Sequence, residues 1–87
     1  MGLRFEIFYH ADVARKDLPK ITDDIKQRIR KAIELKLTIA PQEFGDPLRR
    51  TLKGYWKLRV GDYRIIYKIE PKQVLILRIG HRREVYE

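Results

Sequence analysis

The segment from Lys57 to Tyr67 constrains the fold more than any other part of the chain, because it has the pattern of a β-hairpin. Apolar and polar residues alternate on both sides of a central Gly61-Asp62 pair, and two such runs around a two-residue turn are typical of antiparallel strands. Gly61 comes first in the turn, which favours a type II′ geometry because glycine tolerates a positive φ. The predicted cross-strand pairs are Val60 with Tyr63, Arg59 with Arg64, Leu58 with Ile65, Lys57 with Ile66, and Trp56 with Tyr67.

The period of two gives this hairpin one apolar face and one basic face. The predicted core face contains Trp56, Leu58, Val60, Tyr63, Ile65 and Tyr67. The opposite face carries Lys57, Arg59, Arg64 and Lys68, with Ile66 among them. Arg59 and Arg64 lie directly opposite each other, and like charges in that position destabilise a sheet. Neither arm has a carboxylate on this face, so two interpretations stay open: a bound phosphate offsets the repulsion, or the face is solvated and the two side chains splay apart.

The net charge of +8 is concentrated in the part of the chain that contains the hairpin. Residues 1–48 hold nine basic and eight acidic residues, whereas residues 49–87 hold eleven basic and four acidic residues. A concentrated basic field favours nucleic acid or another polyanion as the partner.

Several kinds of site are not expected from the composition. The chain has no cysteine and only two histidines, so neither a disulfide, a zinc site nor another metal or cofactor is predicted. No apolar run approaches transmembrane length and no signal peptide is visible, which predicts a cytoplasmic protein without a membrane partner.

The 87 residues are expected to form a single α+β domain, residues 1–87. We predict a strand over 3–9, a short helix from an Asp12 N-cap to residue 18, and a longer helix from Thr22 to about residue 40. A turn-rich linker precedes the hairpin, and a central strand over 74–79 follows it until Gly80 breaks it. The order β-α-α-β-β-β places two N-terminal helices on a mainly antiparallel four-stranded sheet, with the basic residues on its open face.

Three segments carry a combined motif: Leu52-Lys53-Gly54, the hairpin from Lys57 to Tyr67, and Gly80-His81-Arg82-Arg83-Glu84-Val85-Tyr86. Together they resemble the RelE/ParE toxin superfamily, and its RelE branch in particular. The resemblance implies a RelE-like fold and a toxin that cleaves mRNA in the ribosomal A site. The cleavage would proceed by metal-independent attack of a ribose 2′-OH on the adjacent phosphate. The implied partners are the ribosome, its mRNA and a RelB-like antitoxin that blocks the toxin.

The resemblance also implies roles for individual residues. Lys57 corresponds to the family's basic position and could act as the base if neighbouring positive charge lowers its pKa, and Arg64 corresponds to the arginine that holds the scissile phosphate. Arg82 corresponds to the residue that stabilises or protonates the leaving group, and Tyr86 to the tyrosine that contacts or stacks on the codon. Arg59 stands where some members have lysine; because arginine stays protonated, it can stabilise charge but cannot act as a base.

His81 occupies a variable position of the family pattern. With an ordinary pKa of about 6.5 it is a candidate acid or base, and it is equally well explained as a polar turn residue. The surface expected to bind RNA contains Lys53, Lys57, Arg59, Arg64, Lys68, Arg82 and Arg83.

Two other functions remain open at this stage. A ParE-like toxin would inhibit DNA gyrase by protein contact without catalysis, and a non-catalytic domain would bind RNA through its basic face and leave it intact. The joint presence of Lys57, Arg64, Arg82 and Tyr86 favours the ribonuclease.

Overall fold

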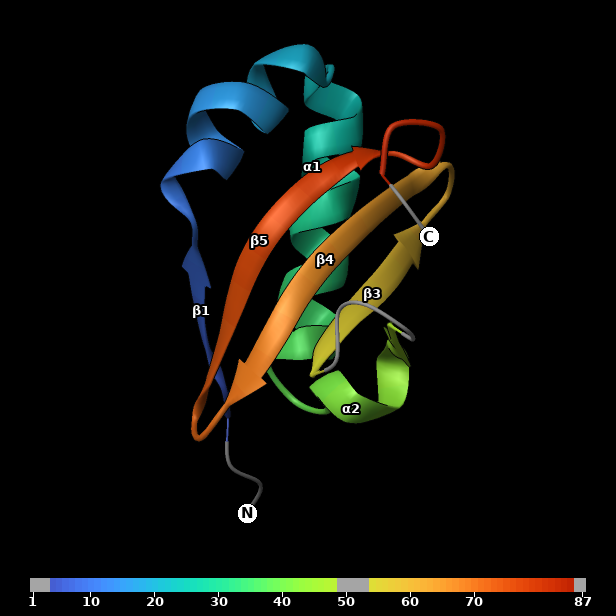
Figure 1. Cartoon of the computed structure of the whole chain (residues 1–87). Helices are drawn as coiled ribbons and strands as arrows, with labels where there is room; N and C mark the ends of the chain where they lie inside the picture. Colours follow the sequence, from blue (N-terminus) through green and yellow to red (C-terminus); the bar gives the residue numbers. More distant parts are fainter. Residues whose placement is uncertain (1–3, 49–53, 86–87) are drawn as a thin grey trace.

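One five-stranded sheet in the order β1-β5-β4-β3-β2 forms the centre of the computed structural model, which describes residues 4–48 and 54–85 (Figure 1). The strands are β1 (Glu6–Tyr9), β2 (Asp46–Pro47), β3 (Tyr55–Val60), β4 (Tyr63–Glu70) and β5 (Gln73–His81). β1 is parallel to β5 and every other neighbouring pair is antiparallel. The predicted α+β class and mainly antiparallel sheet are confirmed, with β2 as a fifth short strand in the predicted linker.

The β3–β4 hairpin has the predicted register along its whole length. Gly61 has a φ of +59°, and Asp62 is not among the residues with a positive φ. That combination defines the type II′ turn. The predicted core face is also confirmed, because Leu58, Ile65 and Tyr67 are buried in the main hydrophobic cluster.

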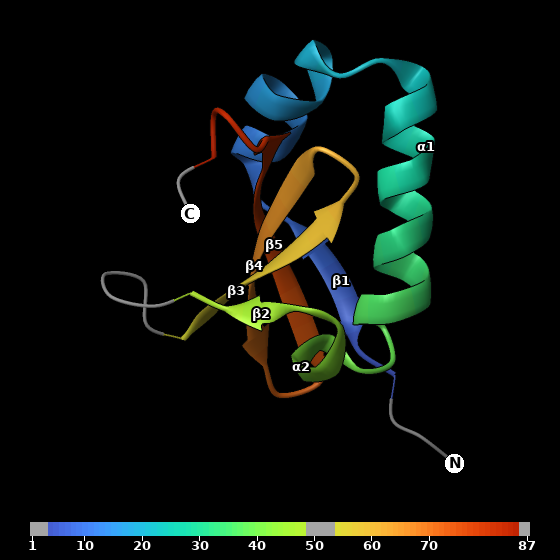
Figure 2. The same cartoon turned by 90° about the vertical axis from the view of Figure 1, so that its right-hand side faces the viewer.

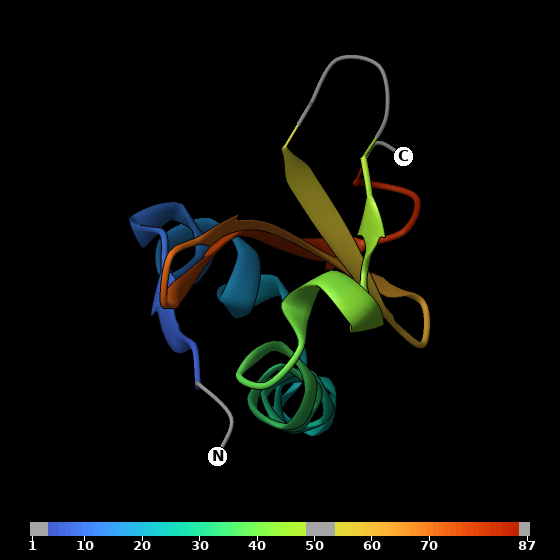
Figure 3. The same cartoon turned by 90° about the horizontal axis from the view of Figure 1, so that it is seen from below.

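A helical layer covers one face of the sheet, and no helix of the described residues covers the face that carries the C-terminal segment (Figures 2 and 3). It consists of α1 (Asp23–Ala32), which continues as the π-helical segment η3 (Ile33–Leu37). Its inner side is apolar: Ile29, Ile33 and Leu37 are buried in the core. The chain leaves the helical layer at Leu37, three residues earlier than predicted, and enters α2 (Pro41–Phe44).

The first helical segment begins differently from the prediction. It comprises η1 (Val13–Asp17) and η2 (Leu18–Lys20). Asp12 already has helical backbone angles and its side chain makes no capping hydrogen bond. Instead, His10 caps the segment, because its Nδ1 accepts the backbone N–H of Asp12 at 3.0 Å and its carbonyl accepts that of Val13 at 2.9 Å. The predicted Asp12 N-cap is therefore wrong, since the chain enters the helical conformation before residue 12.

β5 is the central strand that the sequence predicts, lying between β1 and β4. Gly80 does not break it: β5 continues to His81, and Gly80 pairs with Arg64. A Cβ added at Gly80 would lie 2.7 Å from Cγ2 of Val85. Gly80 is thus required because the C-terminal segment packs closely on the strand.

The end of the hairpin near α2 is held by a buried tyrosine. The hydroxyl of Tyr67 donates to the carbonyl of Pro41 at 2.6 Å, and a Cβ at Gly45 would overlap that hydroxyl. Burial, together with the nearby charge of Asp46, raises the pKa of Tyr67 well above its usual range. Tyr67 therefore fixes α2 and β2 to the sheet as a neutral hydrogen-bond donor.

Candidate active site

The open face of the sheet carries the basic residues of the hairpin, but it is not uniformly solvated. Arg59 is exposed, whereas Arg64, directly opposite it in the register, is only 7 % exposed. Ile66 on the same face is also 7 % exposed. The interpretation of a solvated face with splayed arginines therefore fails for Arg64.

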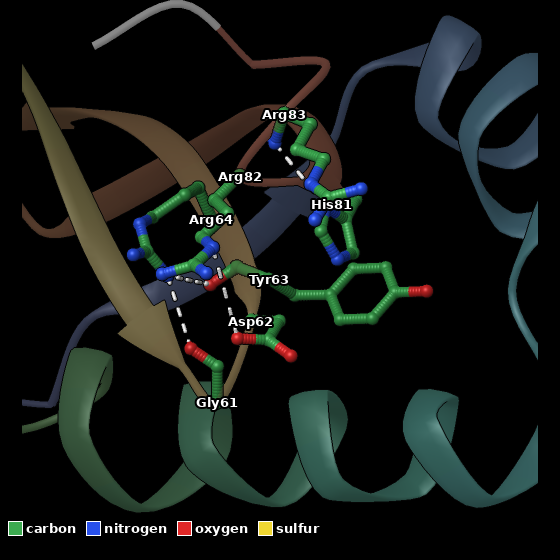
Figure 4. A network of polar contacts seen from close by, with 7 residues as sticks. All are labelled: Gly61, Asp62, Tyr63, Arg64, His81, Arg82 and Arg83. Carbon is green, nitrogen blue, oxygen red and sulfur yellow. Dashed lines mark hydrogen bonds and ion pairs between the residues drawn. The ribbon is translucent and has the colours of Figure 1, made fainter.

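Arg64 folds back onto the turn of its own hairpin. Its Nη1 donates to the carbonyl oxygens of Gly61 and Tyr63, each at 3.0 Å (Figure 4). Carbonyl dipoles that face a guanidinium lower the energy of its charge. These contacts offset part of the predicted repulsion between Arg59 and Arg64, and they fix the position of a buried cation.

Arg82 is held by the same turn. Its backbone N–H donates to the carbonyl of Asp62 at 2.7 Å, and its Nε lies 3.9 Å from Oδ1 of Asp62. The two side chains of this ion pair are 55 % and 66 % exposed. The structure thus brings together Arg64 and Arg82, which are far apart in the sequence, at one end of the hairpin.

The C-terminal segment reaches this position through a tight turn. The backbone N–H groups of Glu84 and Val85 both donate to the carbonyl of His81, and Arg78 Nη2 donates to the carbonyl of Glu84. Val85 is buried and packs on Gly80. Sequence reasoning missed this anchor, although Val85 stands out as an apolar residue in a charged segment.

His81 points to the other face of the sheet. It pairs with Tyr63, whose ring packs against the core, and the two rings make an edge-to-face contact with centroids 5.6 Å apart. Nδ1 of His81 accepts the backbone N–H of Arg83 at 3.2 Å. The neutral imidazole then carries its proton on Nε2, so it offers a donor there rather than a base.

The two lysines of the basic face lie in different surroundings. Lys57 is half-buried between Ile66 of β4 and Asp46 of β2 in the register. Lys68 lies toward the far end of β4, where its Nζ is 3.7 Å from Glu70 and 6.0 Å from the Tyr55 ring centroid. Arg83 is exposed in the C-terminal turn. Lys53 and Tyr86 lie outside the described residues.

One further cation lies beside the turn. Arg28 of α1 approaches from the helical side, its Nη2 being 3.5 Å from the position of a Cβ at Gly61. Arg28 and Asp62 both line a cavity of about 180 Å³ between α1 and the turn. The sequence gives no signal for this neighbour, which only the hairpin register together with the packing of α1 reveals.

Other features do not point to a small-molecule or metal site at the arginines. A cavity of about 670 Å³ lies elsewhere, between α1 and η1, and is lined by Leu18, Ile29 and Ile33 among others. In the ranges 4–48 and 54–85 no group of three or more histidine, aspartate or glutamate residues could hold a metal ion. Nor does this part of the chain contain a helix long and apolar enough to cross a membrane.

Comparisons with known proteins agree with the fold and with the sequence motifs. The family model described as "ParE toxin of type II toxin-antitoxin system, parDE" matches residues 9–86. Toxin RelG of Mycobacterium tuberculosis is 37% identical over 75 residues, which cover 84% of this chain and 86% of that protein. Toxin RelE of the same organism is 31% identical over 83 residues, with coverages of 90% and 86%.

Solved structures give the same result. The toxin–antitoxin complex RelBE2 of Mycobacterium tuberculosis contains a chain that superposes with a TM-score of 0.84 at 31% identity, covering 97% of this chain and 98% of that one. A chain of the RelB-RelE antitoxin–toxin complex of Methanococcus jannaschii superposes with a TM-score of 0.70 at 22% identity, covering 91% and 94%. The chain belongs to the RelE/ParE superfamily, as a RelE-like toxin of a type II toxin–antitoxin system.

Proposed function

We propose that this toxin is a ribosome-dependent endoribonuclease that cleaves mRNA in the ribosomal A site without a metal. The observation that carries the proposal is the convergence of Arg64 and Arg82 on one turn, at the basic end of the open face. Two positioned cations suit a reaction in which negative charge develops on a phosphate and on a leaving oxygen.

In the proposed reaction the ribose 2′-oxygen attacks the adjacent phosphorus, so that the O2′–P bond forms as the P–O5′ bond breaks. Arg64 binds the scissile phosphate and Arg82 stabilises the 5′-oxygen as it leaves. Arg59 adds charge beside Arg64, and Lys57, as the neutral amine, accepts the 2′-proton. Tyr86 stacks on the codon, while Lys53, Lys68 and Arg83 contribute to the RNA-binding surface.

His81 has no direct part in this proposal, because its ring lies with Tyr63 on the face opposite Arg64. Lys57 is then the one proposed base, and the ribosome must orient the 2′-OH for attack. We therefore expect free RNA to resist cleavage. A ribosomal target implies action in the cytoplasm, and RelB-type antitoxins in the complexes of its structural neighbours support a RelB-like antitoxin as its inhibitor.

A primer-extension map of mRNA 5′ ends tests this function. Translating ribosomes are incubated alone, with the protein, with Arg64→Ala, and with Arg15→Ala. The last variant is a matched control, because it removes an exposed arginine on η1. Cuts inside A-site codons that are lost with Arg64→Ala and retained with Arg15→Ala would support the proposal. Intact mRNA in every reaction would refute it.

Inhibition of DNA gyrase is the second candidate, because the family model that matches residues 9–86 is described as a ParE toxin. A supercoiling assay separates the two functions. Loss of gyrase activity at stoichiometric protein, with mRNA intact on ribosomes, would favour the ParE-like function. If the protein bound RNA but neither cleaved it nor inhibited gyrase, the result would favour the function of a non-catalytic RNA-binding domain.

A further inference from the structure

The turn of the β3–β4 hairpin contacts two arginines through three consecutive residues. The carbonyls of Gly61 and Tyr63 accept from Nη1 of Arg64. Between them, Asp62 accepts the backbone N–H of Arg82 and places its carboxylate 3.9 Å from Nε of the same residue. Asp62 is thus the point at which the hairpin and the C-terminal segment meet (Figure 4).

The surroundings of Asp62 are strongly basic. Arg28 lines a cavity together with Asp62, and Arg59 and Arg64 form the last pair of arginines before the turn. A carboxylate in this position opposes the binding of a phosphate, because it reduces the positive field. Its presence therefore needs an explanation other than affinity for RNA.

We infer that Asp62 is a positioning residue for the cleavage reaction. Its carboxylate holds the guanidinium of Arg82 on the side of the turn to which Arg64 is bound, so that both cations reach one phosphate linkage. A long arginine side chain loses considerable rotamer entropy when it is ordered, and a partner that orders it beforehand reduces this loss during the reaction. The inference rests on the proposed function.

The substitution Asp62→Asn removes the charge and preserves the size of the side chain. Asparagine is well tolerated in turns, and the backbone hydrogen bond from Arg82 does not depend on the side chain. We expect the rate of A-site cleavage at saturating ribosome concentration to fall about fivefold, the full effect of one exposed ion pair. The ribosome concentration for half-saturation should stay constant or decrease, because one negative charge is removed.

Two further variants test whether the fall in rate is due to loss of the carboxylate at position 62. Asp62→Glu keeps a carboxylate within reach of Arg82 and should restore most of the rate. Glu43→Gln also removes one exposed carboxylate, but from α2, which lies at the opposite end of β3 from the turn (Figures 1 and 2). It should change neither the rate nor the half-saturating concentration. If Asp62 only weakened RNA binding, Asp62→Asn would instead raise cleavage at low ribosome concentration and leave the saturated rate unchanged.

A measurement without ribosomes follows the contact itself. The Nε–Hε signal of Arg82 in a nitrogen–proton NMR spectrum should exchange with water more slowly in the unsubstituted protein and in Asp62→Glu than in Asp62→Asn. Equal saturated rates for the unsubstituted protein and Asp62→Asn would overturn the positioning role alone. If the unsubstituted protein does not cleave mRNA, the proposed function fails instead, and the role of Asp62 in cleavage fails with it.

Discussion

The two ends of the β3–β4 hairpin differ in burial and charge. At the end near α2, Tyr67 is fully buried, and its hydroxyl is bonded to Pro41 and enclosed by Gly45. At the turn, Arg82 and Asp62 are more than half exposed, and backbone carbonyls hold a buried Arg64. One hairpin therefore separates the groups that stabilise the fold from the charged groups available for chemistry.

The largest expected effect is on the rate of cleavage, and it comes from a substitution at the turn. Arg82→Ala should lower A-site cleavage roughly 100- to 1000-fold, or about 2.7–4 kcal/mol of transition-state stabilisation. Because the side chain is exposed, the free energy of unfolding should change by no more than about 0.5 kcal/mol. Single-turnover cleavage and urea denaturation measure the two quantities. Cleavage at nearly the original rate would refute the assignment of Arg82.

The second prediction concerns the opposite end. Tyr67→Phe keeps the ring but leaves the carbonyl of Pro41 without its donor, so the free energy of unfolding should fall by about 1–3 kcal/mol. Cleavage by the folded protein should be unchanged. Denaturation and cleavage are measured as for Arg82→Ala. A variant that loses activity but not stability would break the separation between the two ends.

The third prediction follows from the raised pKa of Tyr67, caused first by burial and then by the charge of Asp46. Above about pH 10 the tyrosine ionises in the unfolded chain but stays protonated in the folded one, so the folded state binds the extra proton. Stability is then complete below this pH, and is lost at up to about 1.4 kcal/mol per pH unit above it.

Denaturation between neutral pH and pH 11 should therefore show a less steep loss of stability in Tyr67→Phe. A smaller loss should persist in that variant, because burial also raises the pKa of Tyr9. Equal slopes in the two proteins would contradict the third prediction.

The smallest expected effect lies at the turn between β4 and β5. Lys72 has a φ of +66°, the left-handed conformation at the third position of a Pro71-containing turn, where glycine is preferred. Lys72→Gly should raise the free energy of unfolding by about 0.5–1 kcal/mol without changing cleavage. Lys72→Ala makes the same change of charge but keeps a Cβ, so it should give no such gain. Equal stabilities of the glycine and alanine variants would refute the role of backbone conformation.

The sequence predicts the hairpin well because the signals for it are local. They are the alternation of apolar and polar residues along both strands and the glycine at the first position of the turn. The meeting of Arg82 with Asp62 depends instead on a bulge in β5, where Arg78 pairs with Ile66 and Ile76 with Tyr67, leaving Leu77 without a partner in β4. A register shifted by one residue would turn Arg82 to the other face. No local signal locates that bulge, nor the two-residue β2, whose pairing is set by tertiary contacts.

A side chain of η1 covers part of the edge of β5 beyond the end of β1. β1 pairs with β5 only as far as Ile76, and farther along the same side Oδ2 of Asp17 accepts the backbone N–H of Ile79 at 2.8 Å. An exposed strand edge is a template onto which another chain can add. Here the carboxylate of Asp17 occupies one backbone donor of that edge, so a strand that added there would have to displace η1 from Ile79.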